Sequence, residues 1–198
     1  MRKSLIFLIT FFLISIKSIH AYSTDPQEFV KGLINDVISK LSDKTLPEND
    51  KKEFIEKIAL EHVDISALGL YTLGEIRKSA NENDLIEFQK NFEKYFLKTL
   101  SSRLSDYSSN IFEVTGAEQK SSNYTIVNSK IIPTDGKPII KIDWRIYTKN
   151  PDKPLIRDLI VEGLSLARTQ KEEFASILSS NNNEISILIN KLEEFVKR

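Results

Sequence analysis

The sequence predicts an α+β fold in which helices flank an antiparallel sheet along the chain. Apolar residues recur at helical spacing over about residues 25–104, at strand spacing over 110–163, and again at helical spacing over 166–197. Helices, then strands, then helices is the order typical of α+β proteins with an antiparallel sheet. The chain has no Cys, so this fold must rely on packing and not on disulfides.

The chain begins with a segment typical of a secretory signal peptide. A basic start precedes an apolar stretch over residues 4–16, which is shorter than the about 20 residues of a membrane-spanning helix. Lys17 ends the stretch, and Ala21 is a small residue before a plausible cleavage point. We expect a cleaved signal peptide of residues 1–21 and one domain of residues 22–198. The alternative is an uncleaved anchor that tethers the same domain.

The charge balance argues against a nucleic-acid-binding protein. The signal segment holds three basic residues and no acid, and the whole chain has 28 Lys and Arg against 28 Asp and Glu. Removal of the signal therefore leaves a net charge of about −3, whereas nucleic-acid-binding domains usually carry a basic patch and a high pI.

The N-terminal helical region contains signals for several helix ends. Asp25, followed by Pro, is an N-cap signal, and a second helix restarts near Glu48. A short, apolar and buried helix is expected to end near Gly74, and a broken pair of helices is the alternative. Asn81 is an N-cap candidate for a long amphipathic helix that reaches about Leu104 and carries most of the aromatic side chains.

Four runs with strand character follow, separated by turn residues, and predict a sheet of about four or five strands. They cover residues 110–120, 123–133, 138–149 and 154–163. The third run alternates, so that one face is buried and the other is wetter. The apolar face would carry Ile140, Ile142, Trp144 and Ile146, and the polar face Lys141, Asp143, Arg145 and Tyr147.

Two helices are expected after the sheet. The first covers about residues 166–180 and the second about residues 184–197. Between them, Asn181 to Asn183 can supply the left-handed helix cap that Gly usually provides.

No residue pattern points to catalysis or to a metal. Asp158 and Glu162 lie four residues apart on one strand, a span of about 13 Å, which exceeds the spacing of glycosidase carboxylates. We expect structural roles for both, with Asp158 bonded to backbone or to an Arg. His62 lacks a nucleophile motif that would build a catalytic triad, and no ligand cluster for a metal occurs. Gly-rich nucleotide-binding motifs are absent from the sequence.

Two ordered motifs resemble one known family. The first runs Asp158-x-x-x-Glu162-Gly163-Leu164-Ser165 into a helix, and it resembles the C-terminal signature of the MlaC (toluene-tolerance) family of periplasmic phospholipid carriers. The second lies upstream and resembles the aromatic helix of the same family. Its matching positions are Leu73, Gly74, Arg77, Phe88, Phe92, Tyr95, Phe96, Leu104 and Tyr107.

The sequence departs from the family pattern at four places. Leu100 stands where the family often has Tyr, and Lys171 stands where Arg is common. Asn181 to Asn183 replace a Gly-containing turn, and Arg157 stands where an aromatic residue is common. The changes at Leu100 and Lys171 could alter a pocket mouth or a partner contact.

The resemblance implies a periplasmic protein that carries a diacyl phospholipid and is not an enzyme. In this family the lipid passes between an outer-membrane lipoprotein–porin complex and an inner-membrane ABC transporter with MCE domains, which maintains outer-membrane lipid asymmetry. We expect a monomer without a cofactor, with the acyl chains in an apolar cavity between sheet and helices. The expected lining is Leu68, Tyr71, Leu73, Phe92, Tyr95, Phe96, Leu100, Ile142, Trp144, Ile146, Val161, Leu164 and Leu166.

Two other readings stay open. An enzyme on a similar scaffold would need a polar group inside the cavity, and alternation directs Asp143 and Arg145 away from the Trp144 face. An ordinary packed core would instead give a chaperone-like or structural periplasmic domain that binds no lipid.

Overall fold

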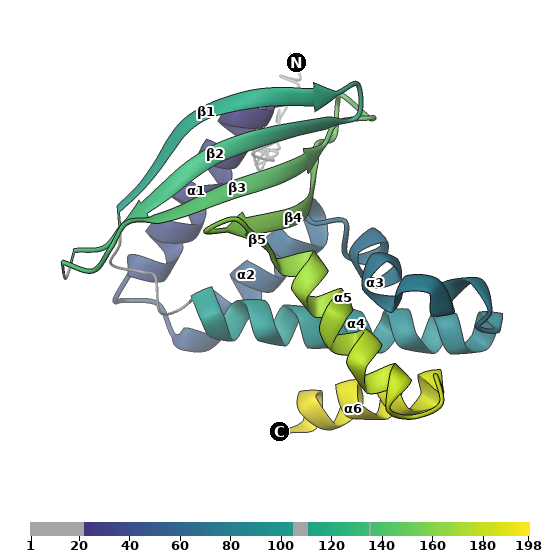
Figure 1. The fold of residues 1–198 in the computed structure, drawn as a ribbon. Helices are drawn as coiled ribbons and strands as arrows, with labels where there is room; N and C mark the ends of the chain where they lie inside the picture. The colour runs from purple at the N-terminus through teal and green to yellow at the C-terminus, as the bar shows by residue number, and fades with distance from the viewer. Residues whose placement is uncertain (1–21, 105–110, 135) are drawn as a thin grey trace, which may run out of the picture.

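The computed structural model describes residues 22–104, 111–134 and 136–198 and has the predicted α+β architecture (Figure 1). The predicted signal peptide, Tyr107 of the aromatic motif and residue 135 lie outside these ranges. The elements in chain order are α1 (Pro26–Ser42), α2 (Glu48–His62), α3 (Ile65–Leu73), a 3-10 helix (Gly74–Lys78), α4 (Glu82–Leu104), β1 (Ile111–Ser121), β2 (Tyr124–Ile132), β3 (Ile140–Tyr147), β4 (Leu155–Val161), β5 (Leu164–Ser165), α5 (Leu166–Ser179) and α6 (Ile185–Lys197).

Local signals in the sequence fix several helix ends. The Asp25 side chain accepts hydrogen bonds from the backbone N–H groups of the first turn of α1. Asn81 Oδ1 accepts the backbone N–H of Asp84 over 2.9 Å at the start of α4. Gly74 ends α3 with a φ of 63°. Asn182 and Asn183 both have positive φ values between α5 and α6, as their expected capping role requires.

The sheet has the strand order β1-β2-β3-β4-β5, and every neighbouring pair is antiparallel. Trp144 on β3 lies opposite Val127 on β2 and Leu159 on β4, which places these side chains on one face. Ile142, Trp144 and Ile146 are buried while their neighbours on β3 are more exposed, so the predicted alternation is confirmed. Among the strands, only the two-residue β5 was not predicted as a separate element.

The buried apolar side chains form two clusters. The sheet cluster joins α1 to the apolar face of the sheet and contains Phe29, Val30, Leu33, Ile34, Val127, Ile131, Ile142, Trp144, Ile146 and Ile156. The helix cluster joins α3, α4, α5 and α6 and contains Ile65, Leu68, Leu73, Phe88, Phe92, Ala167, Phe174, Leu178, Ile185, Leu188, Ile189 and Leu192.

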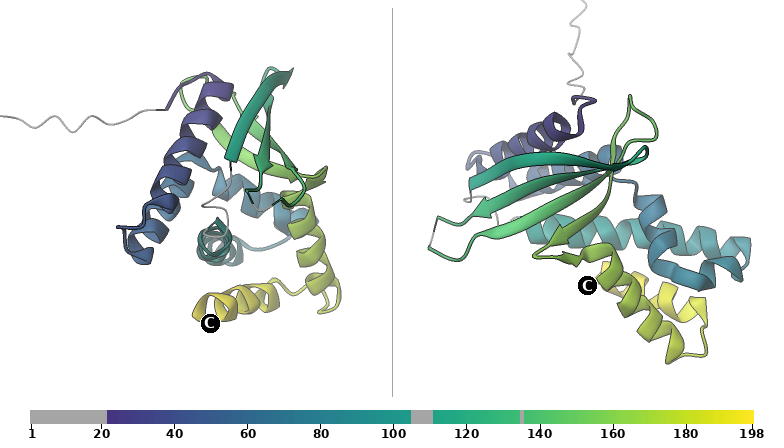
Figure 2. Two further views of the ribbon diagram at one scale, coloured as in Figure 1. Left: turned by 90° about the vertical axis from the view of Figure 1, so that its left-hand side faces the viewer. Right: turned by 45° about the horizontal axis from the view of Figure 1, so that its top comes forward.

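The partly buried Val63 packs against both clusters at the junction of α2 and α3. Figure 2 shows α1 beside the sheet, and α5 leaving the β5 edge of the sheet toward α6. None of the helices in the described part of the chain combines the length and the apolar character needed to cross a membrane.

Candidate ligand cleft

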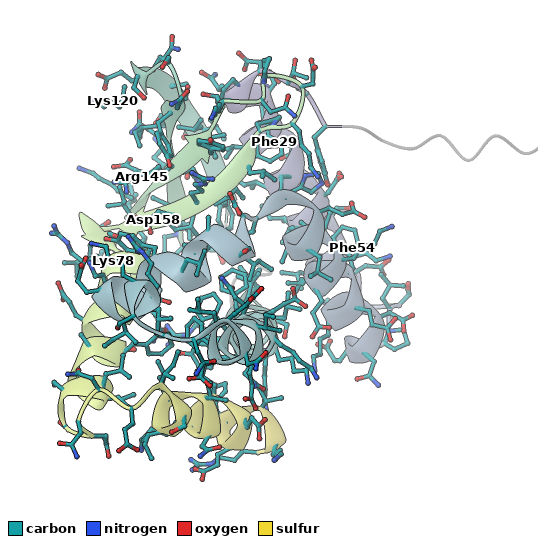
Figure 3. All side chains as sticks on the ribbon, turned by 90° about the vertical axis from the view of Figure 1, so that its right-hand side faces the viewer. Phe29, Phe54, Lys78, Lys120, Arg145 and Asp158 are labelled. Atoms are coloured by element: carbon teal, nitrogen blue, oxygen red, sulfur yellow. The ribbon has the colours of Figure 1, made fainter. Side chains whose placement is uncertain are left out.

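A cleft of about 800 Å³ lies between the sheet and the helices α3 and α5. This volume is typical of sites for small-molecule and cofactor-sized ligands. The cleft occupies the sheet face opposite to that of Trp144. Figure 3 shows Lys120, Arg145 and Asp158 on one side of the sheet and Phe29 on the other. The lining residues are Ala67, Leu68, Tyr71, Glu118, Lys120, Ser121, Tyr124, Ile126, Asn128, Asp143, Arg145, Arg157, Asp158, Ile160 and Ala167.

Strand register places the polar lining side chains together. Arg145 on β3 lies opposite Ile126 on β2 and Asp158 on β4, while Asp143 lies opposite Ile160. Because residues opposite each other in a sheet point to the same face, these side chains form one wall of the cleft. A register shift between Arg145 and Ile146 leaves one additional residue on β4 at this point.

That additional residue, Arg157, attaches the start of α3 to the sheet. Its guanidinium binds Asp64 Oδ2 over 2.7 Å and donates to the Tyr124 hydroxyl over 2.8 Å. The guanidinium carbon lies 3.5 Å from the centre of the Tyr147 ring, which is a close cation–π contact. Asp64 also caps α3 by accepting the Ala67 N–H. Arg157, one of the departures from the family pattern, therefore positions the α3 wall of the cleft.

Asp158 attaches the start of α5, the other helical wall of the cleft, to β4. Its Oδ2 accepts the Ser165 hydroxyl over 2.6 Å, and its Oδ1 accepts the Ala167 N–H over 3.0 Å. Ser165 in turn caps α5 by accepting the N–H of Arg168. The Asp158 residue is 4% exposed, so these bonds replace the water that a free carboxylate would hold. The expected structural role of Asp158 is confirmed.

Glu162 and Gly163 form the turn between β4 and β5. Both have positive φ values, 49° for Glu162 and 82° for Gly163. The Glu162 carboxylate accepts the backbone N–H of Lys141, and the Glu162 N–H donates to the Lys141 carbonyl. This pair of bonds fixes a tight turn that Gly163 allows, so Glu162 also has the expected structural role at the turn.

The predicted lining residues fall into three environments. Leu68 and Tyr71 line the cleft. On the helix side, Leu73, Phe92, Tyr95 and Phe96 belong to or pack against the helix cluster, and Leu100 is partly buried on α4. On the sheet side, Ile142, Trp144, Ile146 and Val161 belong to or pack against the sheet cluster. Leu164 and Leu166 are exposed at the β5–α5 junction, 69% and 47% respectively.

The structure thus brings two of the predicted side chains into the cleft and distributes the others over the two clusters and the surface. Sequence reasoning missed the polar lining residues, although alternation on β3 had already put Asp143 and Arg145 on one face. The alternation does not indicate that α3 and α5 cover part of the face that carries Asp143 and Arg145.

Other titratable groups lie in structural settings. The His62 ring packs edge-on against Tyr22 and Phe29 beside the sheet cluster, and burial lowers the pKa of this imidazole. Asp143 accepts a hydrogen bond from the Asn128 amide over 2.8 Å. Within residues 22–104, 111–134 and 136–198, no group of three or more His, Cys, Asp and Glu side chains could hold a metal ion.

Fold and site together define a class: an α+β binding protein with a ligand-sized cleft between its sheet and its helices. Residues 31–194 match the family described as MlaC protein, and the chain belongs to the MlaC family. No curated protein matches the chain in sequence.

A solved structure with a similar fold is a phospholipid-binding protein from Ralstonia solanacearum in complex with a phospholipid. The similarity has a TM-score of 0.71 and covers 86% of this chain and 96% of that one, at 19% sequence identity. At this identity the likeness establishes a shared fold.

Proposed function

We propose that this chain is a periplasmic carrier that binds a diacyl phospholipid. It passes the lipid between an outer-membrane lipoprotein–porin complex and an inner-membrane ABC transporter with MCE domains. The observation that carries the proposal is a ligand-sized cleft between sheet and helices in a member of the MlaC family. The phospholipid bound by a protein of similar fold adds support.

The apolar part of the cleft offers a physical basis for acyl-chain binding. Leu68 and Ala167 line the cleft and are also buried members of the helix cluster, so the apolar interior begins at the cleft floor. Each methylene that leaves water there contributes about 0.8 kcal/mol. We place the acyl chains against Leu68 and Tyr71 and, past Leu68, against the helix-cluster side chains Leu73, Phe92, Tyr95 and Phe96, with Leu100 further along α4.

The sheet-cluster residues of the predicted lining enter this proposal differently. Ile142, Trp144 and Ile146 pack with α1 on the opposite face, and the Trp144 indole donates to Ser129 Oγ over 2.8 Å. Contact between these side chains and a lipid requires that α1 moves away from the sheet. We therefore centre the proposed lining on α3 and α4.

The first test is mass spectrometry of the organic extract of the mature domain, purified without detergent from a bacterial periplasm. A carrier should yield phospholipid near one molecule per protein. A folded protein without lipid would overturn the proposal in favour of a chaperone-like or structural domain.

A matched pair of variants tests the location. Ala67→Trp fills the cleft from α3 and should abolish lipid retention, because Ala67 lines the cleft without being fully buried. Ala175→Trp adds the same side chain to an exposed position on α5 and should retain lipid. Equal lipid content in both folded variants would place the lipid elsewhere.

A further inference from the structure

Three cationic side chains line the cleft, and two of them are already engaged. Arg157 binds Asp64 and Tyr124 and packs against Tyr147, as described above. The Lys120 amine lies 2.6 Å from a Glu118 carboxylate oxygen. Arg145 is the third cation, and 44% of its side chain is exposed.

Among the described residues, Arg145 makes one long ion pair, with Asp158, and no side-chain hydrogen bond. Its nearest carboxylate oxygen is Asp158 Oδ2, which lies 3.7 Å from Nη1 and thus beyond hydrogen-bond distance. Asp158 does not depend on this contact, because its two oxygens already accept the Ser165 hydroxyl and the Ala167 N–H. The guanidinium donors of Arg145 therefore remain available to a ligand.

The other charges of the cleft leave this donor fork as its main anion-binding feature. The acids Glu118 and Asp143 have their own partners, Lys120 and Asn128. The lining holds as many acids as cations, so attraction of an anion depends on geometry more than on net charge. A guanidinium presents a planar fork that matches two oxygens of a phosphate. Arg145 also lies within a central strand, between β2 and β4, so the backbone from which its side chain extends into the cleft is fixed on both sides.

We propose that Arg145 binds the phosphate group of the ligand at the mouth of the cleft. The inference rests on the proposed carrier function and deepens it: the protein selects lipids that bear a phosphate over neutral lipids with the same acyl chains. The same chemistry would suit a free phosphate ester, and the experiment distinguishes these two sources.

The experiment loads lipid-free protein from vesicles that contain phosphatidylglycerol and diacylglycerol with identical acyl chains, and mass spectrometry then gives the ratio of the two bound lipids. Arg145→Gln should lower the phosphatidylglycerol-to-diacylglycerol ratio roughly tenfold, because it removes charge-assisted hydrogen bonds to the phosphate. Arg145→Lys should fall between, since an ammonium lacks the fork. The control Lys141→Gln removes an exposed charge on the same face of β3, outside the cleft lining, and should keep the wild-type ratio.

An unchanged ratio in Arg145→Gln would overturn the phosphate site while leaving the carrier function intact. Calorimetric titration with glycerol 3-phosphate separates the two sources: binding that Arg145→Gln abolishes shows that a free phosphate ester suffices, whereas lipid selectivity without such binding assigns the site to the lipid headgroup. If the wild type takes up neither lipid, the carrier function fails. In that case Arg145-dependent binding of glycerol 3-phosphate supports the phosphate site, and its absence overturns it.

Discussion

Substitution of Asp158 tests how the cleft is held together. Asp158→Ala leaves the buried Ala167 N–H and the Ser165 hydroxyl without their acceptor. A hydrogen bond to a charged group contributes about 1.5–3 kcal/mol, but the partly buried Ser165 can bind water instead. We therefore expect a loss of about 2–4 kcal/mol in the free energy of unfolding, or roughly 5–15 °C in Tm for a chain of this size.

Urea denaturation, monitored by circular dichroism, measures this loss of stability. Arg145→Gln should cost less than about 1 kcal/mol, because the ion pair is long and Arg145 is 44% exposed. Asp152→Ala, at an exposed loop position, is the control and should change stability by less than about 0.5 kcal/mol. If Arg145→Gln destabilised the protein as much as Asp158→Ala, the carboxylate would be held by the ion pair, and the guanidinium would not be available to a phosphate.

Three further predictions concern the packing, the turn and the histidine. Leu188→Ala should lower the free energy of unfolding by about 2–5 kcal/mol because Leu188 is fully buried in the helix cluster, whereas Ile86→Ala on the exposed side of α4 should lower it by less than about 0.5 kcal/mol. Urea denaturation measures both losses, and similar losses in the two variants would show that the helix cluster is wrongly placed. Gly163→Ala should lower stability by about 1–2 kcal/mol because φ is +82°, while Gly116→Ala meets no atom within 4 Å and should be neutral or slightly stabilising in a thermal melt. Because burial lowers the pKa of His62, the unfolded chain binds more protons than the folded protein, so Tm should fall as pH drops through about 6.5. His62→Gln should make Tm depend less steeply on pH between pH 7.5 and 5.5. An equal dependence of Tm on pH in the wild type and the variant would contradict this prediction.

The features that the sequence predicts well are local. Asp25 and Asn81 cap helices because a side-chain oxygen reaches N–H groups two or three residues ahead. Gly74 and Gly163 have the positive φ values that their positions between elements suggest. The strand runs and the alternation on β3 follow from the two-residue period of a strand, which needs no knowledge of the rest of the chain.

The candidate site depends on long-range contacts that periodicity does not encode. The Asp64 N–H donates to the Ile156 carbonyl, and Arg157 binds the Asp64 carboxylate, so α3 lies over the polar face of the sheet. Nothing in the spacing around Asp64 specifies that partner. In the same way, the sequence patterns around Phe92 and Trp144 allow both side chains to line one cavity. In the structure they pack in separate clusters because α4 and β3 have different neighbours.

The division of the interior into two clusters also bears on how the chain folds. The N-terminal helix α1 packs with strands that come much later in the chain, and α3 and α4 pack with α5 and α6, which follow those strands. Each cluster is thus assembled from two segments that are far apart in the chain. Neither the N-terminal nor the C-terminal half of the chain can therefore be excised as an independently folding unit. Such non-local closure slows folding and leaves apolar stripes uncovered while the chain emerges. We expect that the newly made protein needs to be kept from aggregating until α6 has been added.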